Sequence, residues 1–260
     1  MTAYYNEIDP YAAQWLRNLI TAGHIAPGDV DERSIEDVRP DELRGYRQCH
    51  FFAGIGVWSY ALRCAGWPDD KPVWTGSCPC QPFSSAGKGA GFTDERHLWP
   101  AFFHLIEQCR PGVVFGEQVA SKDGLHWLDL VQTDLEGTGY TSAAVDLCAA
   151  GVGAPHIRQR LYWMGHTNNQ GPQRLRGSSK LVHEDRWKNS ERYPLPSNVV
   201  THIWSEWKPN QGADEKVRAI PACYGSTSVG ITNRVGRLRA YGNAIVASVA
   251  ETFIRAYMEV

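Results

Sequence analysis

Hydrophobic residues in this chain gather in short runs, separated by stretches with the periodicity of amphipathic helices. Three runs are as short as buried strands, at residues 49–52, 113–115 and 161–164. Helical spacing recurs at Trp15, Leu16, Leu19 and Ile20, and again from Val57 to Cys64. Short strands that alternate with helices predict an α/β domain in which helices cover a central sheet.

The pattern changes after residue 166. From Thr167 to Val229 there is little apolar periodicity, and Asn, Gly, Ser, Pro and Trp are frequent. We therefore expect a main domain over 1–166, a small inserted region over 167–229, and a return to the main domain over 230–260. A chain of 260 residues is long enough for this arrangement.

Two motifs early in the chain suggest chemistry. Ala53-Gly54-Ile55-Gly56 joins a predicted strand to a helix, and such a turn lets backbone approach a nucleotide-like ligand, although it also occurs as a plain connection. Pro79 and Pro82 bracket Cys80, and each proline fixes its φ near about −65°. We expect a stiff turn over 77–83 that presents Cys80 as a nucleophile. The alternatives are a redox pair, a metal half-site or a chance pair with Cys78.

Charged residues mark two later strands. Glu117 follows the apolar run 113–115, at the end of a strand where α/β enzymes place their chemistry. Arg158 and Arg160 precede the run 161–164 and alternate onto one face of an extended segment. That spacing suits a clamp on a phosphate or a base.

Five motifs, in order, resemble those of the DNA (cytosine-5) methyltransferases. They are Phe52-Ala53-Gly54-Ile55-Gly56, Pro79-Cys80-Gln81-Pro82-Phe83-Ser84, Glu117-Gln118-Val119, His156-Ile157-Arg158-Gln159-Arg160 and Tyr241-Gly242-Asn243-Ala244-Ile245. The chain departs from the family at His50, Gln118 and His156, where the family usually has Asp, Asn and Gln.

The resemblance implies a Rossmann-like class I S-adenosylmethionine-dependent methyltransferase fold with a small target-recognition insertion at 167–229. It also implies that the Cys80 thiolate adds to carbon 6 of cytosine, that Glu117 acts at ring nitrogen 3, and that Arg158 and Arg160 hold the base and a phosphate. A stacked base is out of reach, so the target would be flipped out of double-stranded DNA. Residues 84–99 would close over it.

By the same resemblance, two sets of residues would bind ligands. The cofactor S-adenosylmethionine would contact Phe52, Ala53, Gly54, Ile55, Gly56, Glu7, Ile8, Asp29, Val30, Pro79, Asn243 and Ala244. The DNA would contact Ser84, Ser85, Lys88, Arg96, Arg174, Arg176 and Arg237.

The ribose- and adenine-binding unit of the family is absent from its usual place after the Gly-rich motif. Instead, residues 5–12, with Glu7, resemble the ribose-binding strand end, and Gly28-Asp29-Val30 resembles the adenine-binding turn. We therefore expect a rearranged enzyme in which a strand, helix and strand unit has moved to the N-terminus. The alternative is that residues 1–48 form an unrelated acidic helical extension.

The net charge of −2 hides a division of charge. Residues 29–42 carry seven acids and two arginines, whereas 156–192 carry eight lysines and arginines against three acids. Residues 216–239 add five basic residues and no acid. A basic C-terminal half is expected of a protein that neutralises phosphates.

Composition adds expectations about setting and partners. There is no apolar run as long as a membrane span and no signal sequence, and seven cysteines without paired spacing suit a reducing compartment. We expect a monomeric cytoplasmic protein of a bacterium or its virus, with a cognate restriction endonuclease as a candidate partner. A metal site through His166, His183 and the cysteines lacks ligand spacing, so we expect no metal.

Two other interpretations stay open. One is a tRNA cytosine methyltransferase built on the same motifs. The other is a binding module that kept the cofactor fold and lost catalysis. The three departures from the family's motifs suggest this interpretation. Because Cys80, Glu117 and both arginines are present, an active enzyme is the better hypothesis.

Overall fold

The computed structural model describes residues 2–79, 98–154, 156–167, 207–211, 217–221 and 243–259. Part of the predicted site lies outside these ranges. It comprises Cys80, most of the loop expected over 84–99, and the predicted DNA contacts Ser84, Ser85, Lys88, Arg96, Arg174, Arg176 and Arg237. Most of the region 167–229 also lies outside, so the domain boundaries stay predictions.

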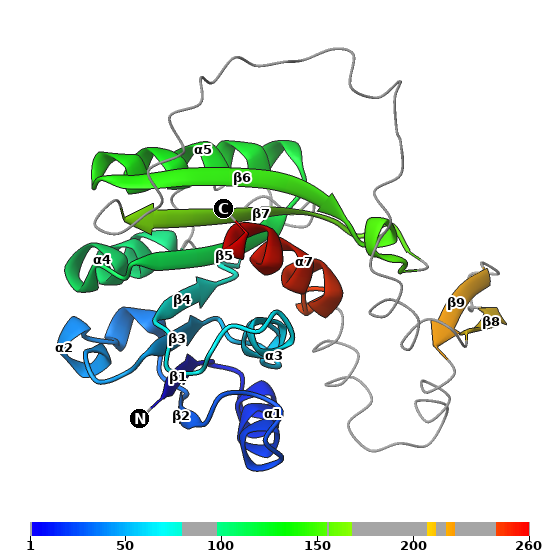
Figure 1. The fold of residues 1–260 in the computed structure, drawn as a ribbon, viewed down its shortest axis with the longest axis horizontal. Coiled ribbons are helices and arrows are strands. Elements are labelled where there is room, and N and C mark those ends of the chain that lie inside the picture. Colours follow the sequence, from blue (N-terminus) through cyan, green and yellow to red (C-terminus); the bar gives the residue numbers. More distant parts are fainter. Residues whose placement is uncertain are drawn as a thin grey trace.

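A seven-stranded sheet forms the centre of the fold, in the order β2-β1-β3-β4-β5-β7-β6 (Figure 1). The strands are β1 (Ala3–Asn6), β2 (Gly28–Asp31), β3 (Gln48–Phe51), β4 (Val73–Gly76), β5 (Val113–Val119), β6 (Tyr140–Cys148) and β7 (Gln159–Thr167). The first five strands of this order run parallel, and β7 is antiparallel to both of its neighbours. The predicted α/β sheet is confirmed.

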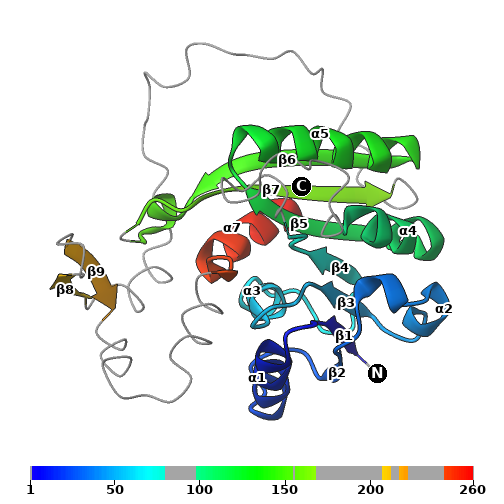
Figure 2. The same cartoon turned by 180° about the vertical axis from the view of Figure 1, so that it is seen from behind.

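Helices cover both faces of the sheet, as Figures 1 and 2 show from opposite sides. One face carries α1 (Pro10–Thr21), α3 (Val57–Cys64) and α7 (Ala247–Met258), and the other carries α2 (Pro40–Leu43), α4 (Trp99–Cys109) and α5 (Lys122–Gly137). Short 3-10 turns complete the chain at η1 (Ile35–Asp37) and η3 (Ala149–Val152). The buried hydrophobic residues form clusters on each face, so the core is divided by the sheet.

The N-terminal segment is part of the sheet. β1 lies between β2 and β3, and Asn6 is directly opposite Phe51 in the parallel register. In the chain, α1 lies between β1 and β2, and it begins at a cap in which Asp9 accepts hydrogen bonds from Tyr11 N and Ala12 N. The buried Leu16 of α1 packs in one hydrophobic cluster with residues of β1. The alternative interpretation, a separate helical extension over residues 1–48, is therefore wrong.

Within the predicted insertion, the described residues form an antiparallel pair of strands, β8 (Trp207–Gln211) and β9 (Val217–Pro221). The five cysteines among the described residues are free thiols. None of the helices in the described part of the chain is long and apolar enough to cross a membrane.

Candidate active site

The Gly-rich turn connects β3 to α3 with three left-handed backbone conformations. Phe52, Gly54 and Gly56 have φ values of 52°, 54° and 79°, which glycine tolerates far better than other residues. A Cβ added at Gly54 would meet nothing within 4 Å, whereas one at Gly56 would come within 3.0 Å of the Leu16 side chain. The turn is therefore packed against α1 at Gly56 and open at Gly54, where a ligand can approach.

Glu7 closes this turn from the neighbouring strand. It directly follows β1, and its carboxylate accepts hydrogen bonds from Gly54 N at 2.7 Å and from Asp9 N at 3.0 Å. Burial raises the pKa of this carboxyl group, although both backbone bonds oppose the rise. The predicted approach of Glu7 to the Gly-rich turn is confirmed.

The surroundings of Glu7 fit the ribose of S-adenosylmethionine. A carboxylate offers about four lone-pair sites, and two of those on Glu7 accept backbone N–H groups. The two others can accept a pair of adjacent hydroxyls. Ile8, the next residue, has 65% of its surface exposed and offers an apolar surface for a ring.

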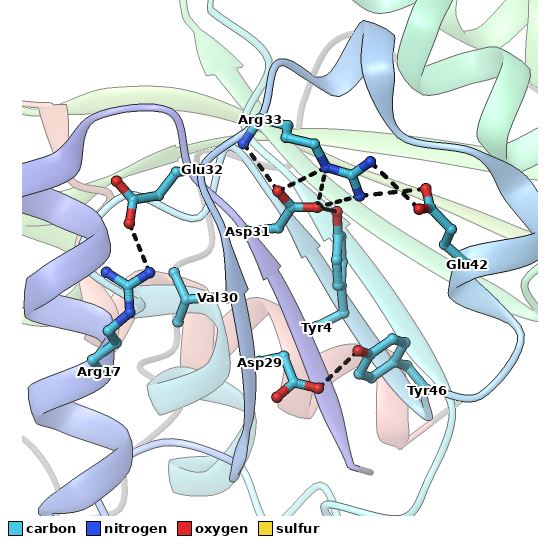
Figure 3. Close-up of a pocket in the computed structure, with 9 residues that line it drawn as sticks. All are labelled: Tyr4, Arg17, Asp29, Val30, Asp31, Glu32, Arg33, Glu42 and Tyr46. Carbon is cyan, nitrogen blue, oxygen red and sulfur yellow. Dashed lines mark hydrogen bonds and ion pairs between the residues drawn. The ribbon is translucent and has the colours of Figure 1, made fainter.

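Asp29 lies elsewhere. It is two residues before the end of β2, and its Oδ2 accepts a hydrogen bond of 2.8 Å from the Tyr46 hydroxyl. Both side chains and Val30 line a pocket of about 410 Å³ (Figure 3). Among the described residues, neither Glu7 nor any residue of the Gly-rich turn lines this pocket. A single cofactor pocket that holds both Glu7 and Asp29 therefore stays a prediction.

Charges in the pocket of Figure 3 are mostly neutralised locally. Arg33 bonds to Asp31 at 2.7 Å and to Glu42 at 3.3 Å, and Arg17 bonds to Glu32 at 2.7 Å across the pocket. Burial acts to raise the pKa of Asp31, but the hydrogen bonds from Arg33 and Tyr4 together hold it below its usual range. The acidic stretch 29–42 thus forms a paired surface at the edge strand.

Glu117 is the buried carboxylate of the site. It lies in β5 with 7% of its surface exposed, and its Oε1 is 2.7 Å from Nε of Arg160. The Ser77 side chain also bonds to it. Burial raises the pKa of Glu117, while Arg160 and Arg158 partly offset the rise. A raised pKa favours the protonated form of Glu117, which is the form that general acid chemistry requires.

The two arginines have different partners. Arg160, in β7, is diagonal to Glu117 across the antiparallel pair and binds its carboxylate. Arg158 precedes β7, and its guanidinium donates to the carbonyl oxygen of Ala244 at 2.9 Å. The motif that precedes α7 is thereby tied to the site, with Ala244 half-buried and Asn243 exposed. The role of the arginines as a clamp on DNA stays a prediction.

Gln118 anchors the segment that leads to Cys80. Its amide nitrogen donates to the carbonyl oxygen of Cys78 at 3.3 Å, and its amide oxygen accepts from Val119 N at 2.8 Å. The departure from Asn is thus accommodated by a side chain that is 2% exposed and whose amide nitrogen and oxygen both have partners. Cys78 is itself buried in the hydrophobic core, whereas Pro79 is exposed. The metal half-site and the redox pair both depend on Cys80, which lies outside the described residues, so these alternatives stay open.

Sequence reasoning missed two residues of this site, Ser77 and Trp58. The Trp58 indole nitrogen donates to Ser77 Oγ at 3.1 Å, and Ser77 in turn contacts Glu117. Ser77 follows β4 directly, which is a signal that could have found it. Trp58 has only the signature of a core residue. In the described part of the chain no group of His, Cys, Asp and Glu could hold a metal ion.

The sheet order, the Gly-rich turn at the end of β3 and the buried carboxylate in β5 define a Rossmann-like, class I methyltransferase fold. The family model of the C-5 cytosine-specific DNA methylases matches residues 66–220, more than half of the chain. The chain therefore belongs to the C-5 cytosine-specific DNA methylase family, whose members take their methyl group from S-adenosylmethionine.

Individual relatives are similar over part of their length. The Type II methyltransferase M.HhaI of Haemophilus parahaemolyticus is 32% identical over 51% of this chain and 53% of its own. M.CviJI of Paramecium bursaria Chlorella virus IL3A is 29% identical over 48% of this chain and 34% of its own. The chain thus spans about half the length of these relatives or less. Among solved structures, DNMT2 of Spodoptera frugiperda aligns with 17% identity and a TM-score of 0.47, over 68% of this chain and 45% of that one.

Proposed function

We propose that this protein transfers a methyl group from S-adenosylmethionine to carbon 5 of a flipped-out cytosine in DNA, through a covalent bond to Cys80. The observation that carries the proposal is the buried Glu117. It is held by Arg160 and Ser77, and its neighbour Gln118 fixes the chain two residues before Cys80. Family membership supplies the reaction class.

The chemistry explains why these side chains belong together. Carbon 5 of cytosine is a poor nucleophile, so the Cys80 thiolate first adds to carbon 6 and turns the ring into an enamine. Negative charge then develops toward ring nitrogen 3, where Glu117 donates a proton or a hydrogen bond. Once carbon 5 carries the methyl group, a base removes the proton from carbon 5, the bond from Cys80 to carbon 6 breaks, and aromaticity returns.

The cofactor supplies the methyl group when it is bound. Glu7 would accept its ribose hydroxyls, Phe52 would lie against its adenine, and the open face of Gly54 would admit its methionine part. Ala53, Ile55, Ile8, Pro79, Asn243 and Ala244 would complete the contacts. Asp29 and Val30 stay our candidates for the adenine edge, with Asp29 exchanging the Tyr46 hydroxyl for the adenine amino group.

On the DNA side, Arg158 and Arg160 would hold the base and a phosphate, and the basic residues of 156–239 would bind the backbone. The family match and the bacterial and viral relatives named as Type II methyltransferases support a double-stranded DNA substrate and a place in restriction-modification. A cognate restriction endonuclease and a monomeric state belong to the same proposal.

A trapping experiment tests the function. Duplex DNA with 5-fluorocytosine at the target positions should form a denaturant-resistant adduct with the parent protein in the presence of S-adenosylmethionine, since fluorine cannot leave as the proton does. Cys80→Ser should form no adduct and lose turnover by at least about a thousandfold. Its affinity for S-adenosylmethionine should match the parent, because the thiol acts in the chemistry and does not hold the cofactor.

The same assay separates the alternatives. Cys78→Ser is the matched control, because Cys78 lies buried two residues before Cys80, and it should still form the adduct. Trapping on a tRNA and not on duplex DNA would replace the DNA substrate by RNA. An adduct that persists in Cys80→Ser would remove Cys80 from the nucleophile's role.

A further inference from the structure

Ser77 links the helix that follows the Gly-rich turn to the buried carboxylate of the site. An indole N–H can only donate, so the Ser77 hydroxyl is the acceptor in its 3.1 Å bond from Trp58. Ser77 directly follows Gly76, which pairs with Gly116 in the parallel register, so Ser77 lies beside Glu117, and the hydrogen of its hydroxyl is available to the carboxylate. The bond from Trp58 thus has a fixed direction and leaves the hydroxyl hydrogen of Ser77 free for the carboxylate.

Trp58, Ser77 and Glu117 form a relay of hydrogen bonds, and packing holds its Trp58 end rigidly. Trp58 is the second residue of α3, two positions after Gly56, and has 5% of its surface exposed. Its ring lies against Phe115 at 6.2 Å and Tyr162 at 5.9 Å between centroids, and these residues belong to the strands that carry Glu117 and Arg160. Any displacement of the first turn of α3 is therefore passed directly to Ser77.

We propose that Trp58 and Ser77 are positioning residues that orient Glu117 for its hydrogen bond to the target base and couple it to occupancy of the Gly-rich turn. The inference rests on the proposed function, because it assigns Glu117 its acid role. Arg160 binds one carboxylate oxygen through Nε. With Ser77 as a second donor, rotation of the carboxyl group is restricted, and two of its about four lone-pair sites are left, one of which can carry the proton for the base.

Kinetic variants test the proposal. Ser77→Ala removes one oxygen and Trp58→Phe removes the indole N–H, and each should lower kcat about tenfold with the KM for DNA changed less than about twofold. Ser77→Thr keeps the hydroxyl and should restore most of kcat. The matched control is Trp67→Phe, because Trp67 is buried in the same cluster but donates to the carbonyl oxygen of Lys71, and it should retain the parent's kcat.

The pH profile separates positioning from a merely structural role. A donor to a carboxylate favours its charged form, so loss of the Ser77 hydroxyl should raise the pKa of Glu117 and move the alkaline limb of kcat to higher pH. Equal profiles for the parent and Ser77→Ala, or an equal loss of kcat in Ser77→Ala and Ser77→Thr, would overturn the proposal.

A second readout does not depend on turnover. In a ¹⁵N spectrum the indole resonance of Trp58, assigned by its loss in Trp58→Phe, should shift on addition of S-adenosylmethionine, and the Trp67 resonance should stay in place. In the parent, the chemical shift of the Trp58 indole should also change with pH as Glu117 titrates. In Ser77→Ala that change should be lost. If the parent protein shows these shifts but methylates no DNA, only the proposed function is contradicted. If the parent protein is active and shows no such shifts, the relay is contradicted.

Discussion

Glu117 is buried and Glu7 is half-buried, and burial raises the pKa of both carboxyl groups, yet their partners differ in kind. Glu7 is bonded by backbone N–H groups of the turn and of its own cap, which fix it as an acceptor. Glu117 is bonded by two side chains, those of Arg160 and Ser77. The first environment suits a ligand's hydroxyl groups, and the second suits a group that gains and loses a proton.

His50 shows how a departure from the family's motif is accommodated. It is 2% exposed in β3, where its ring nitrogens bond to Thr75 Oγ1 at 2.8 Å and Gln48 Oε1 at 3.3 Å. Its ring stacks on Tyr5 at 4.9 Å between centroids. Burial lowers the pKa of His50 to about 3, so it is a neutral hydrogen-bonding residue of the core that joins three adjacent strands.

A pH dependence of stability follows from His50. The unfolded chain binds a proton at this histidine below pH 6.5, whereas the folded protein binds it only near pH 3. The free energy of unfolding should therefore decrease as pH falls through this window, by up to about 1.4 kcal/mol per pH unit from this group. Glu7 and Glu117 act with the opposite sign, because their raised pKa values favour the folded state as their carboxyl groups become protonated.

Denaturant unfolding of the parent and of His50→Asn between pH 4 and 7.5 measures the effect. The difference between the two proteins should shrink as pH falls, since the variant lacks the buried imidazole. The exposed His24 provides the control substitution, His24→Asn, because it removes a surface histidine and leaves His50 in place. A constant difference between the parent and His50→Asn would show that His50 does not titrate as inferred.

At the scale of residues, the sequence predicted which residues belong to the site better than it predicted their contacts. Glu117, Arg158 and Arg160 were predicted from strand ends and alternation, and the structure brings them into one neighbourhood. The two contacts from Ser77 were not predictable, because they join three separate elements. The expectation for Asp29 rested on a tripeptide, while its surroundings depend on the register of β2, which no local pattern fixes.

At the scale of elements, the unit β1-α1-β2 is joined to the rest of the protein by parallel pairing and by one carboxylate. β1 pairs with β3 over four residues, and Glu7 extends that contact to Gly54 beyond the strand ends. The apolar pattern and the motifs predicted that strands exist at the positions of β1 and β2. The short lengths of β1 and β2 were not predictable, because they are set by how far neighbouring strands can pair.

Glu7 should therefore control cofactor affinity. Glu7→Ala and Glu7→Gln should each weaken S-adenosylmethionine binding by at least about tenfold, because hydrogen bonds to a charged group contribute about 1.5–3 kcal/mol. Titration calorimetry measures the dissociation constants. Glu107→Ala, at an exposed acid of α4, is the control and should bind as the parent does. Normal binding by both Glu7 variants would exclude Glu7 from the cofactor site.

At the scale of the whole molecule, the proposed rearrangement concerns connections and leaves the sheet order unchanged. The family match begins at residue 66, so the Gly-rich turn and the N-terminal unit lie before it. The two ends of that unit, Thr2 and Arg47, lie together at the amino-terminal ends of the parallel strands β1 and β3. The carbonyl oxygen of Thr2 accepts bonds from Arg47 N and Gln48 N at 3.0 and 2.9 Å, and that of Arg47 accepts from Val73 N at 3.1 Å.

Because these segment ends meet, the unit should be movable within the chain. A rewired protein that reads 48–70, then 2–47, then 71–260, with short glycine-rich linkers, should form the same sheet, since only loop closure changes and its entropy varies slowly with length. It should unfold cooperatively and bind S-adenosylmethionine within about threefold of the parent, as the contact between Glu7 and Gly54 would re-form.

The control places residues 2–47 after Gly137 instead, between α5 and β6. β6 is at the opposite edge of the sheet from β2, so short linkers cannot reach β3 from there. This protein should lose cofactor binding and much of its stability. Circular dichroism melting and calorimetry distinguish the outcomes. If the rewired protein fails to fold while the parent folds, the N-terminal position of the unit is itself required for folding, and the idea that only connections were exchanged is wrong.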